Sequence, residues 1–151
     1  MRPWLISGLT LAADQLTKAL IVASFVRGES LPLLPPLLCL TYVQNTGAAF
    51  GLFKGQQPLF VILSLLVIGV ITWELATKRA NDAVTVWGCG LVLGGAAGNL
   101  IDRLRLGYVI DFIDLRVWPV FNVGDSAITV GVALLLFHSM IAARRQATRD
   151  K

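Results

Sequence analysis

The sequence is poor in charged residues, which make up only 15% of its 151 positions. In soluble domains, roughly a quarter of all residues are charged. The low charged fraction of this chain therefore excludes an ordinary water-facing surface. Hydrophobic residues account for 56% of the chain, and the mean hydropathy is +0.72. We therefore predict one domain, residues 1–151, that buries its surface in a lipid bilayer.

Histidine and cysteine are also scarce, with one histidine and two cysteines in the chain. Cys39 and Cys89 form neither a disulfide framework nor a metal-binding Cys-x-x-Cys motif. His138 is expected near the cytoplasmic end of the fourth span, far from the cluster of acidic residues at the outer face, which leaves a His-dependent triad or a zinc site without a candidate geometry. The net charge of +4 comes from dispersed basic residues that flank apolar runs. This arrangement fits phospholipid head groups and argues against nucleic acid as a partner.

Long apolar runs make up most of the sequence. Three of them are uncharged and near the ~20 residues that a membrane-spanning helix needs. A fourth run, at the N-terminus, has the length but contains Asp14 and Lys18; a cleaved signal peptide is the alternative interpretation. We predict spans at 3–26, 55–76, 83–101 and 123–143, with extracytoplasmic segments at 27–54 and 102–122.

The uncharged segment after the first span is not expected to be a fifth span. Pro32, Pro35 and Pro36 would break a spanning helix. Leu38–Val43 is instead predicted to be a short strand in a small extended platform at the membrane interface. Gly107–Trp118 is expected to be partly extended as well.

The basic residues favour an orientation with both termini in the cytoplasm. Seven of them fall on the side of the termini and five on the other. The short Lys78-Arg79 loop and the basic C-terminal tail adjoin span ends, where the positive-inside rule has most weight.

Two spacings inside the predicted spans indicate structural roles. Asp14 and Lys18 are four residues apart, so they share one helical face and can neutralise each other toward the bundle interior or a site. Gly90, Gly94 and Gly98 recur every four residues and predict a small-residue face for close helix packing.

Polar residues follow at the outer end of the third span. Asn99, Asp102 and Arg103 can orient other groups or bind a substrate backbone there. A simple cap at the membrane interface is an equally good interpretation.

Two aspartates at the outer face are the candidate catalytic residues. Asp111 stands among bulky apolar residues, where a carboxylate is costly unless it is paired or used. Asp125 opens the fourth span, where it can also be a helix N-cap. Two carboxyl groups within hydrogen-bond reach share a proton, so one can act as base and the other as acid on a peptide bond. Spacing alone leaves Asp102 and Asp114 as alternative partners.

Other classes of function stay open at this point. A proton-coupled carrier would relay protons through Asp14, Lys18, Asp111 and Asp125, but it needs acidic groups at several depths. A noncatalytic assembly protein would tolerate replacement of both outer aspartates.

Five strings, in one order along the chain, resemble the motifs of a known family. They are Asp14-Gln15 with Lys18, Gln44–Gly51, Gly98–Arg103, Val109–Phe112 and Phe121–Ile128. On these residues the chain resembles lipoprotein signal peptidase, also called signal peptidase II. The resemblance implies an all-α polytopic protein of the bacterial inner membrane, with four transmembrane helices, a small extracytoplasmic β-sheet cradle and a short helical arm.

The resemblance also implies an aspartyl endopeptidase that cuts prolipoproteins on the amino side of a diacylglyceryl-modified cysteine. It assigns the catalytic dyad to Asp111 and Asp125, with no metal or organic cofactor. Globomycin-type inhibitors are expected in the same pocket, at the periplasmic face, and the chain is expected to act as a monomer among membrane phospholipids. The residues implied to line or support the site are Asp14, Lys18, Asn45, Gly47, Asn99, Asp102, Arg103, Asn122 and Ala127.

One residue departs from the family pattern. Gly124 stands where the family usually has alanine, directly before the second aspartate. Glycine is more flexible and is expected to loosen Asp125 without removing a catalytic group.

Overall fold

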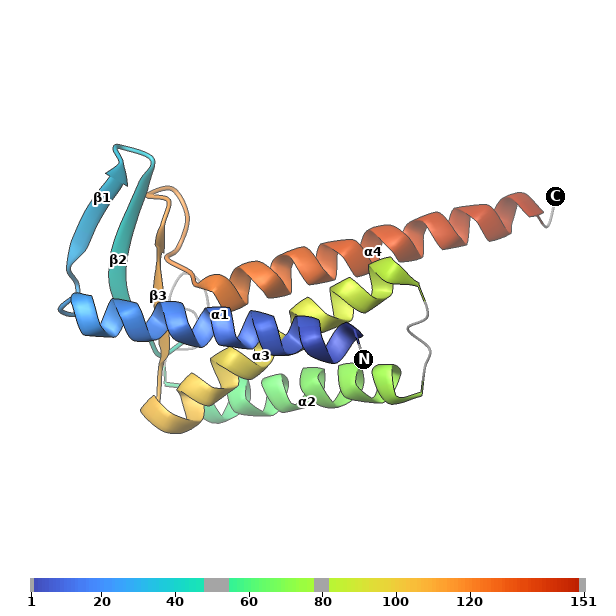
Figure 1. Cartoon of the computed structure of the whole chain (residues 1–151), viewed down its shortest axis with the longest axis horizontal. Helices are drawn as coiled ribbons and strands as arrows, with labels where there is room; N and C mark the ends of the chain where they lie inside the picture. The colour runs from blue at the N-terminus through green and yellow to red at the C-terminus, as the bar shows by residue number, and fades with distance from the viewer. Residues whose placement is uncertain (1, 48–54, 78–81, 150–151) are drawn as a thin grey trace.

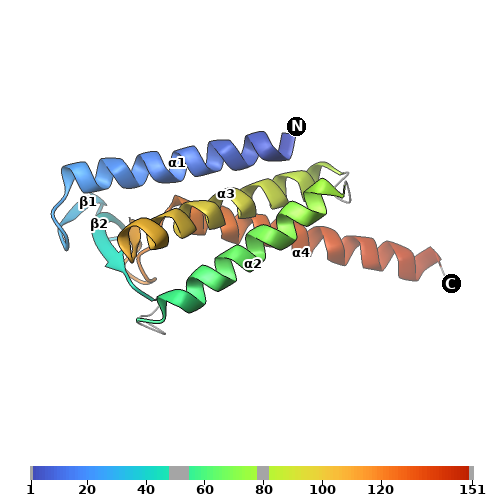
Figure 2. The ribbon, with the colours of Figure 1, turned by 90° about the horizontal axis from the view of Figure 1, so that it is seen from below.

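The computed structural model describes residues 2–47, 55–77 and 82–149. Four helices run along one another, with a small sheet at one end (Figures 1 and 2). Each helix is long and apolar enough to cross a membrane, which confirms the predicted number of spans. The helices are α1 (Arg2–Ser24), α2 (Gln57–Ala76), α3 (Ala83–Leu106) and α4 (Val123–Arg149).

Helix α3 is the centre of the bundle, between α1, α2 and α4 (Figure 2). In its most apolar stretch, 61% of the residues are buried, against none in α2. Its glycines explain this difference, because they let neighbouring backbones approach closely. Gly90 faces Ile6 of α1, and Gly95 faces the Gly124 carbonyl of α4. The predicted packing role of the glycine stripe is therefore confirmed.

The tightest of these glycine contacts gives a stability prediction. A methyl group at Gly98 would collide with the Asp14 carboxylate, whereas one at Gly8 would have no neighbour within 4 Å. We expect Gly98→Ala to cost about 1–3 kcal/mol, as overpacking usually does. Gly8→Ala, the matched control, should leave the melting temperature in detergent unchanged or slightly higher. Equal melting temperatures for the two variants would contradict the packing at Gly98.

The sheet has three antiparallel strands in the order β1-β2-β3: β1 (Ser30–Leu34), β2 (Leu38–Asn45) and β3 (Val109–Asp114). Pro32 lies in the edge strand, where a residue without an N–H is tolerated. The strand predicted at Leu38–Val43 is confirmed and extends to Asn45. The extended character predicted for Gly107–Trp118 is confirmed in β3.

A small hydrophobic core fastens the sheet to the bundle. Ile21 of α1 is buried together with Tyr42 of β2 and with Ile110 and Phe112 of β3. Because β3 follows α3 and precedes α4 in the chain, this core fixes the sheet relative to three of the helices.

Some boundaries differ from the expected ones. Helix α3 continues past Ile101 to Leu106, so Asp102 and Arg103 are helical. The helix ends at Gly107, which has a left-handed φ of 84° and donates its N–H to the Arg103 carbonyl. Helix α4 continues past residue 143 to Arg149. The predicted short helical arm is absent from the described residues between α1 and α2, and residues 48–54 lie outside them.

Candidate active site

Strand β3 places Asp111 at the end of the bundle that carries the sheet. Val43 of β2 pairs with Asp111, so Asn45, two residues further along β2, lies on the same face of the sheet. The Asn45 side-chain amide donates to Asp111 Oδ2 at 2.8 Å, and the Asn122 amide donates to Asp111 Oδ1 at 2.7 Å. The side chain of Asp111 is almost completely buried.

Asp125 lies in the first turn of α4 and is not its N-cap. Asn122 takes that position: its Oδ1 accepts from the Asp125 backbone N–H at 2.8 Å. In return, Asp125 Oδ2 accepts from the Asn122 N–H at 3.3 Å, which makes a reciprocal capping box. The other carboxylate oxygen of Asp125 accepts from the Asn99 side-chain amide at 2.8 Å. Both oxygens are thus held by neighbours.

Asn122 therefore connects the two aspartates. Its side-chain amide contacts Asp111, while its backbone N–H and its side-chain oxygen contact Asp125. It is fully buried, and its amide also contacts Asn99 Oδ1 at 3.2 Å. Because Asn122 is held in place, it keeps the two carboxyl groups at a fixed position relative to each other.

Both carboxyl groups open onto one cavity of about 350 Å³. Arg103 also lines this cavity, and its guanidinium lies 5.2 Å from the centre of the Phe60 ring, in a cation–π contact. The remaining lining residues are Asn45, Gly47, Val109, Trp118, Pro119, Val120, Phe121 and Thr129. The cavity thus combines an acidic pair with one cation and mostly apolar walls.

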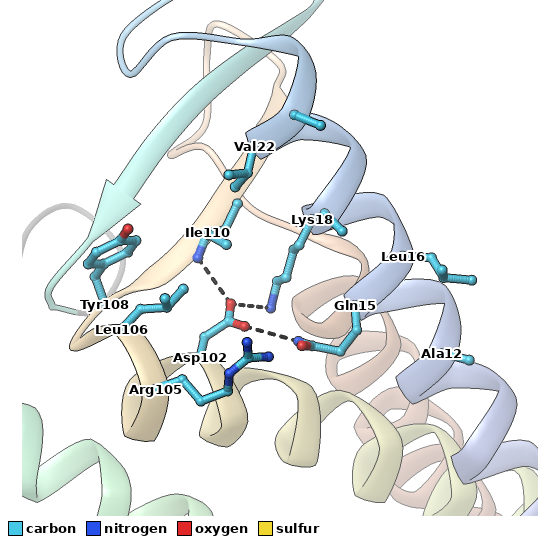
Figure 3. Close-up of a pocket in the computed structure, with 12 residues that line it drawn as sticks. Ala12, Gln15, Leu16, Lys18, Val22, Asp102, Arg105, Leu106, Tyr108 and Ile110 are labelled. Carbon is cyan, nitrogen blue, oxygen red and sulfur yellow. Dashed lines mark hydrogen bonds and ion pairs between the residues drawn. The ribbon is translucent and has the colours of Figure 1, made fainter.

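Behind Asn99 lies a buried ionic network. Lys18 Nζ contacts Asp14 and Asp102 at 2.8 Å each, and it donates to Asn99 Oδ1 at 2.8 Å. The ion pair predicted between Asp14 and Lys18 is present, and Asp102 is its unforeseen third member. Figure 3 shows Asp102 held by Lys18, by the Gln15 amide and by the Ile110 backbone N–H. Lys18 thus supports the residue that orients Asp125.

Asp14 also reaches α4. Its Oδ1 accepts from the Gly124 N–H at 2.8 Å. A methyl group at Gly124 would lie 3.0 Å from this same oxygen and 3.1 Å from the Gly95 carbonyl oxygen. The close approach of α4 to α1 and α3 makes glycine a good fit here, and the hydrogen bond holds the backbone directly before Asp125.

Asp102 and Asp114, which the sequence left open as alternative members of the acidic pair, lie in different surroundings. Asp102 belongs to the Lys18 network. Asp114 lies at the far end of β3, where it accepts from Thr41 and from the Arg116 N–H at 2.8 Å each. Burial raises the pKa of Asp114, but these hydrogen bonds and the Arg116 charge outweigh burial and lower it below its usual value. Neither residue lines the cavity of Asp111 and Asp125.

The pKa of Asp111 is raised to about 7. Burial is the main cause, and the negative charge of Asp125 adds to it. The hydrogen bonds from Asn45 and Asn122 act in the opposite direction, but they do not cancel these effects. Near neutral pH, Asp111 therefore carries its proton for a large part of the time.

The other predicted site residues lie close by. Gly47 donates its N–H to Asn45 Oδ1 at 2.9 Å and so orients the amide that contacts Asp111. Ala127 is buried in the first turns of α4, two residues after Asp125.

Several residues at the site were not predicted as site residues from the sequence, among them Gln15, Phe60 and Trp118. Gln15 braces Asp14 and Asp102, and its place beside Asp14 was the signal available for it. Phe60 and Trp118 line the cavity, but nothing distinguishes them from the many other apolar residues of the sequence. Among the residues that the structure describes, no group of three His, Cys, Asp or Glu side chains is placed to hold a metal ion.

Comparison with known proteins identifies the family of this chain. A family model described as "Signal peptidase (SPase) II" matches residues 6–141. A lipoprotein signal peptidase from Syntrophomonas wolfei is 47% identical over 146 residues, which cover 97% of both chains. The corresponding protein from Pelotomaculum thermopropionicum is 46% identical over 132 residues, covering 87% of both chains.

Solved structures share the fold of this chain. One, described as a bacterial membrane enzyme, superposes with a TM-score of 0.86 at 30% identity, over 99% of this chain and 91% of its own. A second with the same description has a TM-score of 0.82 at 31% identity, over 90% of both chains. The predicted architecture of four helices with a small sheet is thus confirmed.

Proposed function

Because the chain belongs to the signal peptidase II family, a family of proteases that cleave lipoprotein signal peptides, we propose that Asp111 and Asp125 are its catalytic pair. The observation that carries this proposal is the bridge made by Asn122, which contacts both carboxyl groups beside one cavity. No metal or organic cofactor takes part in the proposed reaction.

The two aspartates have different protonation roles. Asp111, with a pKa of about 7, supplies the proton. Asp125 is the base, because N–H groups of Asn99 and Asn122 point at its oxygens and stabilise its negative charge. This division of roles resembles other carboxyl pairs whose environments separate the acid from the base.

The proposed reaction balances without another reactant. Water attacks the carbonyl carbon of the scissile bond, one of its protons passes to Asp125, and Asp111 gives its proton to the carbonyl oxygen. The tetrahedral intermediate then collapses as the carbon–nitrogen bond breaks. The leaving nitrogen takes the proton from Asp125, and Asp111 recovers its own proton from a hydroxyl of the intermediate. Both residues return to their starting states.

The substrate we propose is a diacylglyceryl-modified prolipoprotein, cut on the amino side of the modified cysteine. The lipid on that cysteine keeps the scissile bond near the membrane surface. Asp111 and Asp125 lie where the helices end and the sheet begins, so they meet the bond at that depth. Globomycin-type inhibitors are proposed to occupy the same cavity.

The family and the four apolar helices fit a protein of the bacterial inner membrane. We propose that the sheet and the active site face the periplasm, that both termini are cytoplasmic, and that the chain acts as a monomer within the phospholipid bilayer. The positive-inside pattern of the sequence supports this orientation.

The pKa of Asp111 predicts how cleavage depends on pH. The protonated acid is required, and its fraction falls as the pH rises through about 7. We expect kcat to fall roughly tenfold for each pH unit on the alkaline side of that value. The check is the initial rate of prolipoprotein cleavage in detergent between pH 6 and 9. A rate that stays level or rises over this range would contradict the role of Asp111 as acid.

A further inference from the structure

A second cavity lies between α1 and α3, at the end of the bundle near the sheet. Its volume is about 720 Å³. The two helices touch closely at Gly90, Gly94 and Gly98. The next position of this stripe is Asp102, whose side chain meets Lys18 of α1. Because large side chains replace glycine from there on, the helices separate and leave the cavity between them (Figure 3).

The wall that α1 gives to this cavity contains an apolar row beside the polar Gln15 and Lys18. Ala12, Leu16, Ala19 and Ala23 form this row, at spacings of four, three and four residues, so they share one face of the helix. This row is about 16 Å long at the rise of an α-helix. Half of the hydrocarbon core of a bilayer is about 15 Å thick. Leu16 is 65% exposed, so the cavity is open to the lipid side of the bundle.

Arg105 of α3 lies across the cavity from this apolar row. Figure 3 shows its side chain extending from α3 into the space shared with Gln15 and Asp102. Within the described part of the chain, the Arg105 guanidinium has no hydrogen-bond or ion-pair partner. Asp102 is already held by Lys18, Gln15 and the Ile110 N–H. Arg105 is therefore a cation available for an external anion.

The cavity is separate from the one that holds Asp111 and Asp125. The two share no lining residue, and the Lys18 network lies between them. Arg103 and Arg105 illustrate the separation: residues two apart point to nearly opposite faces of a helix. Arg103 lines the catalytic cavity and Arg105 the other. The lipid part of a substrate bound at the aspartates is thus not the natural occupant here.

We propose that this cavity binds one anionic phospholipid of the bilayer, with an acyl chain along the α1 row and the phosphate on Arg105. Lys18, the other cation of the cavity, is already paired with Asp14 and Asp102. An available cation beside an apolar row one leaflet long matches the charge and the length of such a lipid. Arg105 is in the last turn of α3, where the helix leaves the hydrocarbon and meets the head groups. The bound lipid fills the space between α1 and α3 and stabilises their separation.

The test is native mass spectrometry of the detergent-solubilised protein with added phosphatidylglycerol or phosphatidylethanolamine. Wild type is expected to retain one phosphatidylglycerol more tightly than phosphatidylethanolamine. Arg105→Gln should weaken phosphatidylglycerol binding by about tenfold or more, since a charge-assisted contact is lost. Arg145→Gln, an equal change of charge on the exposed tail of α4, should have no effect. Equal retention by the two variants would overturn the proposal.

A second pair of variants tests the acyl-chain row. Ala19→Trp fills the cavity and should reduce retention of both lipids, whereas Ala13→Trp, on an exposed part of α1 outside the cavity, should not. Unchanged retention by Ala19→Trp would show that the chain does not lie there and would overturn the proposal. Binding should persist in Asp111→Asn, which separates this site from the catalytic proposal.

Discussion

Replacing Asp111 or Asp125 with asparagine is expected to abolish prolipoprotein cleavage while the chain stays folded. Asparagine keeps the shape and one acceptor oxygen, so each variant loses one of the two hydrogen bonds that its carboxylate accepts. The proton transfers are lost entirely. Because acid and base act on the same transition state, we expect kcat to fall by about 10³-fold or more. The measurement is cleavage of a diacylglyceryl prolipoprotein by purified protein in detergent.

The matched control is Asp114→Asn, the same chemical change at the other end of β3. It removes a negative charge near Arg116 but leaves the catalytic cavity intact, so cleavage should stay within a few-fold of wild type. The double variant Asp111→Asn with Asp125→Asn should be no slower than either single one, as for groups that act as a unit. Normal turnover by either single variant would contradict the assignment of Asp111 and Asp125 as the catalytic pair.

Replacing Lys18 with methionine is expected to have the largest effect on stability. The Lys18 side chain is buried between Asp14 and Asp102, and both carboxylates would lose their cation. Removing one partner of a buried ion pair usually costs about 3–5 kcal/mol. The variant should therefore unfold at a much lower temperature in detergent, as followed by circular dichroism. It should also cleave more slowly, because Lys18 supports Asn99 and hence Asp125.

A double variant distinguishes lost charge balance from lost packing. Adding Asp102→Asn to Lys18→Met removes one of the two stranded charges, so the double variant should be more stable than Lys18→Met alone. If the double variant is less stable, with the two losses simply adding, the ionic account of this network is wrong.

Several features of the fold follow from the sequence because their causes are local. A run of about 20 apolar residues is enough to predict a spanning helix, since the bilayer itself selects it. The prolines at 32, 35 and 36 exclude a fifth helix for an equally local reason. The spacing of Asp14 and Lys18 predicts their ion pair, and the spacing of three glycines predicts the close contact of α3 with its neighbours.

The identity of the acidic pair depends on more than the local sequence. The sequence places Asp111 and Asp125 at one face of the membrane, but Asp102 and Asp114 fit that description equally well. The family motifs favour the first two residues. The structure supports the same choice by geometry: Asp102 is engaged by Lys18, and Asp114 by Thr41 and Arg116. The apolar sequence around Asp111 gave no sign of the amides that hold it.

The sequence alone thus determined that the chain spans a bilayer and how many spanning helices it has. It also placed the four candidate aspartates at one end of those helices. Tertiary structure decided which partner each polar group has. Asn122 bridges the two aspartates because β3 pairs with β2 and then leads into α4. Asp14 holds the Gly124 N–H across 110 positions of the chain. Such contacts depend on how distant segments pack, and hydropathy, which depends only on near neighbours, carries no information about them.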